Sequence, residues 1–152
     1  MRIVLASDHA GFELKGVILE HLRAEGHEVI DLGTDSTDPV DYPPFCAAAA
    51  RAVVQGRAEL GVVLGGSGQG EAMAANKVHG ARAALCQDES MARLARLHND
   101  ANVLSLGARI VARERALSIV AVFLDSGFEG GRHVGRLAEL ARIETEECGG
   151  GR

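Results

Sequence analysis

Short apolar segments alternate with helix-like segments along the whole chain. The apolar runs predict strands at residues 2–8, 27–32, 60–64, 81–86 and 102–106. Between and after them, helical spacing of apolar residues and end signals such as Pro43-Pro44 predict helices at 12–25, 43–54, 72–77, 88–98, 112–124 and 132–147. Strands that alternate with helices form a mostly parallel sheet covered on both faces. We therefore expect an α/β fold with three αβα layers around a five-stranded parallel sheet.

Length and composition fit one ordinary globular domain. The chain has 152 residues, of which 47% are hydrophobic and 24% are charged, and no segment approaches the roughly 20 apolar residues of a membrane helix. We expect a single Rossmann-like domain over residues 1–148 and a frayed glycine-rich tail at 149–152. The net charge of −5 offers no general attraction to nucleic acid or an anionic membrane. An anionic small molecule would need a local basic cluster.

The three cysteines, Cys46, Cys86 and Cys148, lie far apart and form no C-x-x-C pair. An odd, scattered set predicts free thiols in a reducing cytoplasm, not a disulfide framework or a zinc site. Cys46 and Cys86 lie in apolar runs, which is typical of core residues. The first residues read as a strand and not as a signal peptide. We expect a cytoplasmic protein without a bound metal or cofactor.

A glycine-rich loop, Gly65-Gly66-Ser67-Gly68-Gln69-Gly70-Glu71, follows the third predicted strand. Glycines let the backbone approach a ligand closely, and a helix start offers free N–H groups to an anion. A carboxylate would repel a phosphate there, so Glu71 indicates proton transfer, with Ser67 and the loop amides able to hold an oxyanion. The loop is neither a Walker A motif nor a good dinucleotide fingerprint. A turn needed only for packing is the alternative.

Further polar candidates follow predicted elements. Asp8 and His9 end the first strand, at the carboxyl edge of the sheet where such folds bind ligands. Asp8 could also merely cap the next turn. His98 and Asn99 close the fourth helix, where a helix C-terminus explains them equally well.

A basic cluster near the carboxyl end of the chain is the candidate for holding an anion. Arg132 and Arg136 lie one turn apart on the last predicted helix, and Arg109 follows the fifth strand. The two helical arginines predict either a fork for a phosphate or a solvated basic face.

Taken together, these motifs resemble the type B ribose-5-phosphate isomerases, within the family that includes galactose- and allose-phosphate isomerases. The matching pieces, in order along nearly the whole chain, are Ser7-Asp8-His9-Ala10-Gly11-Phe12, Asp41-Tyr42-Pro43, Gly66-Ser67-Gly68-Gln69-Gly70, Ala74-Ala75-Asn76-Lys77, His98-Asn99-Asp100-Ala101-Asn102-Val103-Leu104, Gly107-Ala108-Arg109 and Phe128-Glu129-Gly130-Gly131-Arg132-His133. The resemblance implies a metal-independent interconversion of ribose 5-phosphate and ribulose 5-phosphate through a cis-enediolate, a step of the pentose phosphate pathway.

The family has two branches that differ in the catalytic base. One carries a Cys at the position of Gly65, whereas the other, which this chain resembles, uses a Glu at the position of Glu71. The resemblance assigns proton transfer between C2 and C1 to Glu71 and ring opening to His98. The resemblance further implies that Asp8 transfers hydroxyl protons, and that Ser67 and the amides of Gly66, Gly68, Gln69 and Gly70 stabilise the enediolate oxygen. It also implies that Tyr42 and Asn99 line the sugar. The phosphate would be held by His9, Arg109, Arg132 and Arg136. The resemblance also implies a homodimer whose two chains share their active sites. A tetramer made of two such dimers is the alternative.

Two other functions stay open at this point. The first is isomerisation of another phosphosugar, such as an allose, galactose or tetrulose phosphate, which pocket length decides. The second is a catalytically silent module that binds a phosphosugar or nucleotide, against which the joint presence of Glu71, Ser67, Asp8 and His98 argues. Whether the helix start or burial controls the ionisation of Glu71 also stays open.

Overall fold

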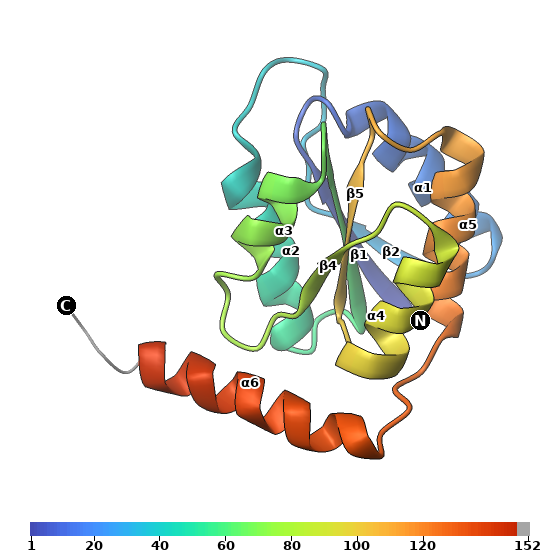
Figure 1. Ribbon diagram of the computed structural model, residues 1–152. Helices are drawn as coiled ribbons and strands as arrows, with labels where there is room; N and C mark the ends of the chain where they lie inside the picture. The colour runs from blue at the N-terminus through green and yellow to red at the C-terminus, as the bar shows by residue number, and fades with distance from the viewer. Residues whose placement is uncertain (149–152) are drawn as a thin grey trace.

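In the computed structural model, which describes residues 1–148, five parallel strands form a sheet with helices on both faces (Figure 1). The strands are β1 Arg2–Ser7, β2 Glu28–Asp31, β3 Leu60–Gly65, β4 Ala83–Leu85 and β5 Val103–Gly107. The helices are α1 Phe12–Ala24, α2 Tyr42–Val54, α3 Gln69–Ala75, α4 Glu89–Asn99, α5 Arg113–Asp125 and α6 Arg132–Cys148. The sheet order is β2-β1-β3-β5-β4, and the predicted α/β fold is confirmed. The tail expected at 149–152 lies outside the described residues.

Each face of the sheet has its own hydrophobic core. In β1, Ile3 and Leu5 pack with residues of α1, α4 and α5, whereas Val4 and Ala6 pack with α2 and α3. This alternation follows from the two-residue period of a strand. A parallel sheet covered on both faces explains why its strands are almost continuously apolar. None of the described helices combines the length and apolarity that crossing a membrane requires.

All predicted boundaries except the start of α3 are correct to within two residues, and the differences at β4 and α3 are informative. β4 covers only Ala83–Leu85 instead of residues 81–86. The Asn76 side chain takes the place of a strand partner, since its Oδ1 accepts from the Ala83 N–H at 2.8 Å and its Nδ2 donates to the Ala83 carbonyl at 2.9 Å. α3 begins at Gln69, three residues earlier than predicted, and so includes part of the glycine-rich loop.

Helix α6 lies apart from the two helical layers and crosses beneath the sheet, at the edge where the strands begin (Figure 1). Among its described residues, only His133 is buried. The Glu144 carboxylate fastens the helix by accepting the Gly80 N–H at 3.0 and 3.1 Å. Val134, Leu140 and Ile143 are all about half exposed. An amphipathic helix with exposed apolar side chains is typical of a surface that a partner covers.

Candidate active site

The loop between β3 and α3 brings a carboxylate into the protein at the carboxyl edge of the sheet. Glu71 lies in the first turn of α3, and only 4% of the residue is exposed. Gly68 precedes the helix with φ of 79°, and a Cβ there would lie 2.7 Å from Leu85 Cδ1 and 2.8 Å from the Leu106 carbonyl carbon. Ser105 Oγ donates to the Gly68 carbonyl at 2.6 Å. Glycine at this turn therefore allows the tight approach that directs Glu71 inward.

Glu71 folds back over the end of its own strand. A Cβ at Gly65 would overlap the Glu71 carboxylate. Its Oε2 is buried and has no hydrogen-bond partner among the described residues. Burial raises the pKa of Glu71; backbone N–H groups at the helix start oppose the rise and the Asp8 carboxylate adds to it. Of the two effects that the sequence left open, burial is the larger. An unpaired buried oxygen is costly and is free to receive a proton from a ligand.

Asp8 and His9 lie beside this loop at the end of β1. Asp8 is buried, and its Oδ1 accepts the Gly11 N–H at 3.1 Å, which is the turn-capping role considered for it above. The Nδ1 of His9 lies 3.2 Å from the Val40 nitrogen and 3.3 Å from the Val40 oxygen. When the Val40 N–H donates to Nδ1, the proton of the neutral ring lies on Nε2, where it can be donated to an anion.

Two further predicted residues flank the glycine-rich loop. Tyr42 is the first residue of α2, and a Cβ at Gly70 would lie only 2.5 Å from its hydroxyl oxygen. The Arg109 N–H donates to the Gly66 carbonyl at 3.0 Å, and a Cβ at Gly66 would lie 3.1 Å from Arg109 Nη1. Within the loop, the Gln69 N–H donates to Ser67 Oγ at 3.3 Å. The structure thus brings together a carboxyl-edge group of Asp8, His9, Tyr42, Gly66, Ser67, Gly68, Gln69, Gly70, Glu71 and Arg109.

The remaining predicted residues form a second, amino-edge group: His98, Asn99, Arg132 and Arg136. α4 ends at Asn99, just before β5 begins at the opposite edge of the sheet. The first turn of α6 lies against it, and Arg132 and Arg136 are exposed there. The Cα atoms at the two ends of a five-residue strand are about 13 Å apart, so β5 alone separates the two edges by more than the length of a five-carbon phosphosugar. One chain therefore does not bring His98 and Glu71 to a single ligand.

The amino-edge group includes a histidine pair that the sequence did not predict. The rings of His98 and His133 stack at a centroid distance of 4.2 Å and an interplanar angle of 13°. Burial lowers the pKa of His133, and the neighbouring His98, Arg132 and Arg136 lower it further, against an opposing effect of Glu129. In the sequence, His133 is a single histidine between Arg132 and Arg136. Unless the packing of α6 against α4 is known, this pattern indicates only a basic helix.

Glu129 completes a trio with these histidines, and the nearest ligand atoms of the three residues all lie within 4.8 Å of one another. His98 Nε2 lies 3.7 Å from Glu129 Oε2. A metal ion requires lone pairs that converge on one point, whereas near-parallel stacked rings direct their in-plane lone pairs side by side. The adjacent Arg132 and Arg136 add positive charge. The arrangement fits two stacked imidazoles better than a metal centre.

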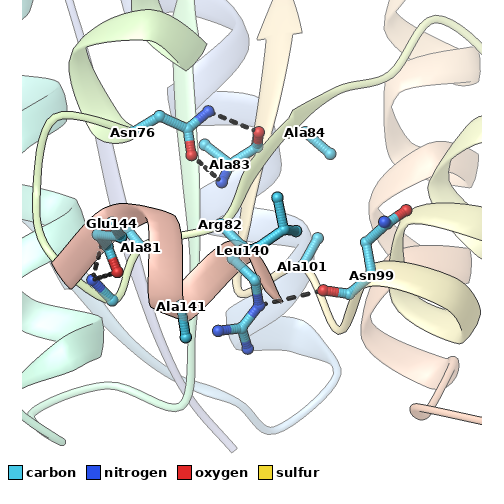
Figure 2. A pocket seen from close by; sticks show the side chains of 11 residues that line it. Asn76, Ala81, Arg82, Ala83, Ala84, Asn99, Ala101, Leu140, Ala141 and Glu144 are labelled. Carbon is cyan, nitrogen blue, oxygen red and sulfur yellow. Dashed lines mark hydrogen bonds between the residues drawn. The ribbon is translucent and has the colours of Figure 1, made fainter. Parts of the chain in front are cut away.

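A pocket of about 410 Å³ lies between α6 and β4, also at the amino edge (Figure 2). Its polar lining groups already pair within the chain: Asn76 with Ala83, Glu144 with Gly80, and Arg82 Nε with the Asn99 carbonyl at 3.1 Å. Among the described residues that line this pocket, Asn99 is the only one that was predicted as a site residue. The pocket therefore lies where α6 packs against the rest of the protein, and it is separate from the carboxyl-edge group.

Comparison with known proteins gives one consistent result. A sequence profile of the family described as Ribose/Galactose Isomerase matches residues 3–140. Ribose-5-phosphate isomerase B of Mycobacterium leprae is 49% identical over 95% of this chain and 90% of that protein. The Escherichia coli K12 protein of the same name is 43% identical over 94% of this chain and 96% of that protein.

Solved structures agree with the sequence comparisons. Ribose-5-phosphate isomerase B of Clostridium thermocellum superimposes with a TM-score of 0.96 at 46% identity, covering 97% of this chain and 99% of that one. The Mycoplasma genitalium enzyme of that name, solved with bound ribulose-5-phosphate, gives a TM-score of 0.91 at 44% identity, with 95% and 97% covered. This chain therefore belongs to the ribose/galactose isomerase family and is an enzyme of the aldose–ketose isomerase class.

Proposed function

We propose that this chain interconverts ribose 5-phosphate and ribulose 5-phosphate through a cis-enediolate, without a metal ion or cofactor. The observation that carries the proposal is the buried Glu71 carboxylate, with an unpartnered oxygen and a raised pKa at the ligand-binding edge of the sheet. The names of the similar proteins, and the ribulose-5-phosphate bound to the Mycoplasma genitalium enzyme, support the choice of substrate.

In the proposed reaction Glu71 moves one proton between neighbouring carbons. The carboxylate removes the C2 proton of the open aldose, the C–H electrons form the C1–C2 double bond, and the C1 carbonyl oxygen becomes an enediolate oxygen. Return of the proton to C1 gives the ketose. A carbon acid beside a carbonyl is weak, so the enediolate needs preorganised donors, which Ser67 and the loop amides would supply. Asp8 would exchange the hydroxyl protons.

Two observations support Glu71 over a cysteine as the base. The Glu71 carboxylate occupies the space that a side chain at Gly65 would need. The nearest thiol to consider, Cys46, is fully buried, and burial, followed by the charges of Glu71 and Asp8, raises its pKa to about 12. Such a thiol stays protonated at neutral pH and is a poor base or nucleophile. Cys46, Cys86 and Cys148 are all free, which supports the proposed reducing cytoplasm.

We further infer that two copies of the chain share their active sites. The carboxyl-edge group of one copy would receive His98, Asn99, Arg132 and Arg136 from the other, which supplies the ring-opening histidine and the arginines for the phosphate. The positions of the two groups at opposite edges support this division. Exposed apolar side chains near the β4 edge support an interface there, for example Met73 with 64% of its surface exposed, Leu94 and Val134.

The direct test is turnover of four-, five- and six-carbon phosphosugars by the purified protein in the presence of a chelator. We expect ribose 5-phosphate to be the best substrate and the chelator to have no effect. A clear preference for a four- or six-carbon phosphosugar would show that the proposed substrate is wrong, although the proposed isomerisation chemistry would still hold. Absence of turnover with every sugar would favour a binding module. Native mass in solution separates a dimer from a tetramer.

A further inference from the structure

Lys15 is a buried lysine that the proposed chemistry does not use. It lies in α1 with only 2% of its surface exposed, and it is among the largest fully buried side chains of the described residues. Lysine is rarely buried to this degree, because an ammonium group without water is costly unless it is paired and hydrogen-bonded. Its partners therefore indicate what it does.

The Lys15 ammonium fastens the corner that follows β2. Its Nζ donates to Asp31 Oδ1 at 2.5 Å and to the Thr34 carbonyl at 2.7 Å. The same Asp31 oxygen accepts the Gly33 N–H at 2.9 Å. The corner also pairs with the end of β1, since the Ser7 N–H donates to the Gly33 carbonyl at 2.7 Å and the Thr34 N–H to the Ser7 carbonyl at 2.8 Å. Lys15 thus ties α1 to the segment beside Asp8.

This corner begins the loop that connects β2 to α2 (Figure 1). Residues 35–39 are mostly exposed, and the loop next bonds to the body of the protein at Val40, whose N–H donates to His9 Nδ1. Two residues later Tyr42 starts α2 against Gly70. The loop is therefore held at its start by Lys15 and at its end by His9.

We propose that Lys15 is a positioning residue for the active site, which holds the 31–34 corner and thereby sets the places of His9 and Tyr42. The inference rests on the proposed function, in which His9 contacts the phosphate and Tyr42 the sugar. Removal of the ammonium leaves the buried Thr34 carbonyl without its donor, whereas the partly exposed Asp31 carboxylate can hydrate. The loop should loosen while the Ser7 bonds keep the corner folded.

The chain contains a built-in probe for this loop. Tyr42 is the only tyrosine and there is no tryptophan, so the intrinsic fluorescence of the protein reports on Tyr42. We expect Lys15→Met to increase the quenching of this fluorescence by acrylamide. We also expect it to raise KM for ribose 5-phosphate about tenfold with a smaller change in kcat, since His9 and Tyr42 would bind substrate and transition state alike. Lys15→Arg should restore part of both. Arg23→Met, which removes an exposed cation from the same helix, should behave as the wild type.

Unchanged quenching and unchanged KM in a folded Lys15→Met protein would overturn the proposal, even if its melting temperature falls, because that result describes a purely structural lysine. If Lys15→Met does not fold, Lys15→Gln is measured in the same way. Its neutral side chain is one atom shorter and cannot hold both Asp31 and the Thr34 carbonyl, and unchanged values there would equally overturn the proposal. If the wild type does not isomerise the sugar, the proposed function fails, whereas the quenching comparison still tests the placement of Tyr42.

Discussion

The overlap between Gly65 and Glu71 makes a single methyl group a test of the proposed base. In Gly65→Ala, the new Cβ would coincide with the Glu71 carboxylate and would lie 2.9 Å from Glu71 Cγ. Carbon atoms in contact are about 3.5–4.0 Å apart, so the side chain must move by roughly 1 Å or more. A displacement of about 1 Å in a catalytic group costs about 100-fold in rate, or about 2.7 kcal/mol of activation free energy. We expect kcat for ribose 5-phosphate to fall by at least that factor.

The matched control is Gly16→Ala, because a Cβ at Gly16 meets nothing within 4 Å. Alanine in that helical position should stabilise the fold by about 0.5–1 kcal/mol and leave kcat unchanged. A double-mutant comparison sharpens the result: Gly65→Ala in a Glu71→Gln background should cost little more, since the base is already absent. A folded Gly65→Ala protein with wild-type kcat would refute the assignment of Glu71 as the base in its observed position.

Three further predictions follow from the same geometry. Glu71→Gln should slow the exchange of the C2 proton with deuterated solvent by about 100- to 10,000-fold, the factor expected for loss of a general base. Phosphosugar binding, followed by Tyr42 fluorescence, should stay near that of the wild type. An exchange rate equal to that of the wild type would contradict the role of Glu71 as the base. Because burial raises the pKa of Glu71 above 4.5, its ionisation opposes folding, so stability from this group is greatest below pH 4.5 and is lost as pH rises through the raised pKa. Glu71→Gln should therefore melt at a higher temperature than the wild type at pH 7, and a difference that instead grows on acidification would show the opposite sign. Co-expressed Glu71→Gln and Arg132→Ala chains, each nearly inactive alone, should recover about a quarter of wild-type activity if random dimers restore one intact site in each mixed pair; recovery no greater than the sum of the two parents would argue against shared sites.

The fold followed from the sequence because its signals are local and mutually consistent. Strand-like and helical periods alternate without interruption, and a parallel sheet is the arrangement that buries such strands. The same alternation puts the glycine-rich loop at the carboxyl edge and the end of α4 at the amino edge. The start of β4 was predicted too early because the Arg82 N–H donates to the side-chain Oδ1 of Asn102 at 2.7 Å and not to a backbone carbonyl of β5, a contact that the pattern of apolar residues does not reveal.

The environments of individual side chains could not be predicted in this way. The burial of Glu71 depends on the space left by Gly65 and on the turn at Gly68 against Leu85 and Leu106, which are contacts between separate elements. The stack of His98 on His133 requires α6 to dock on α4. Lys15 was overlooked because a lysine next to an apolar helical stripe is ordinarily exposed, and its partners belong to the corner after β2.

The shared space of Gly65 and Glu71 also restricts how this chain could exchange one catalytic base for another. Under the proposed mechanism, a side chain gained at Gly65 while Glu71 is present would displace the carboxylate, and loss of Glu71 while Gly65 is present would leave no base at this edge of the sheet. Transfer of the base from one position to the other would therefore need both substitutions together, because either one alone would impair the enzyme.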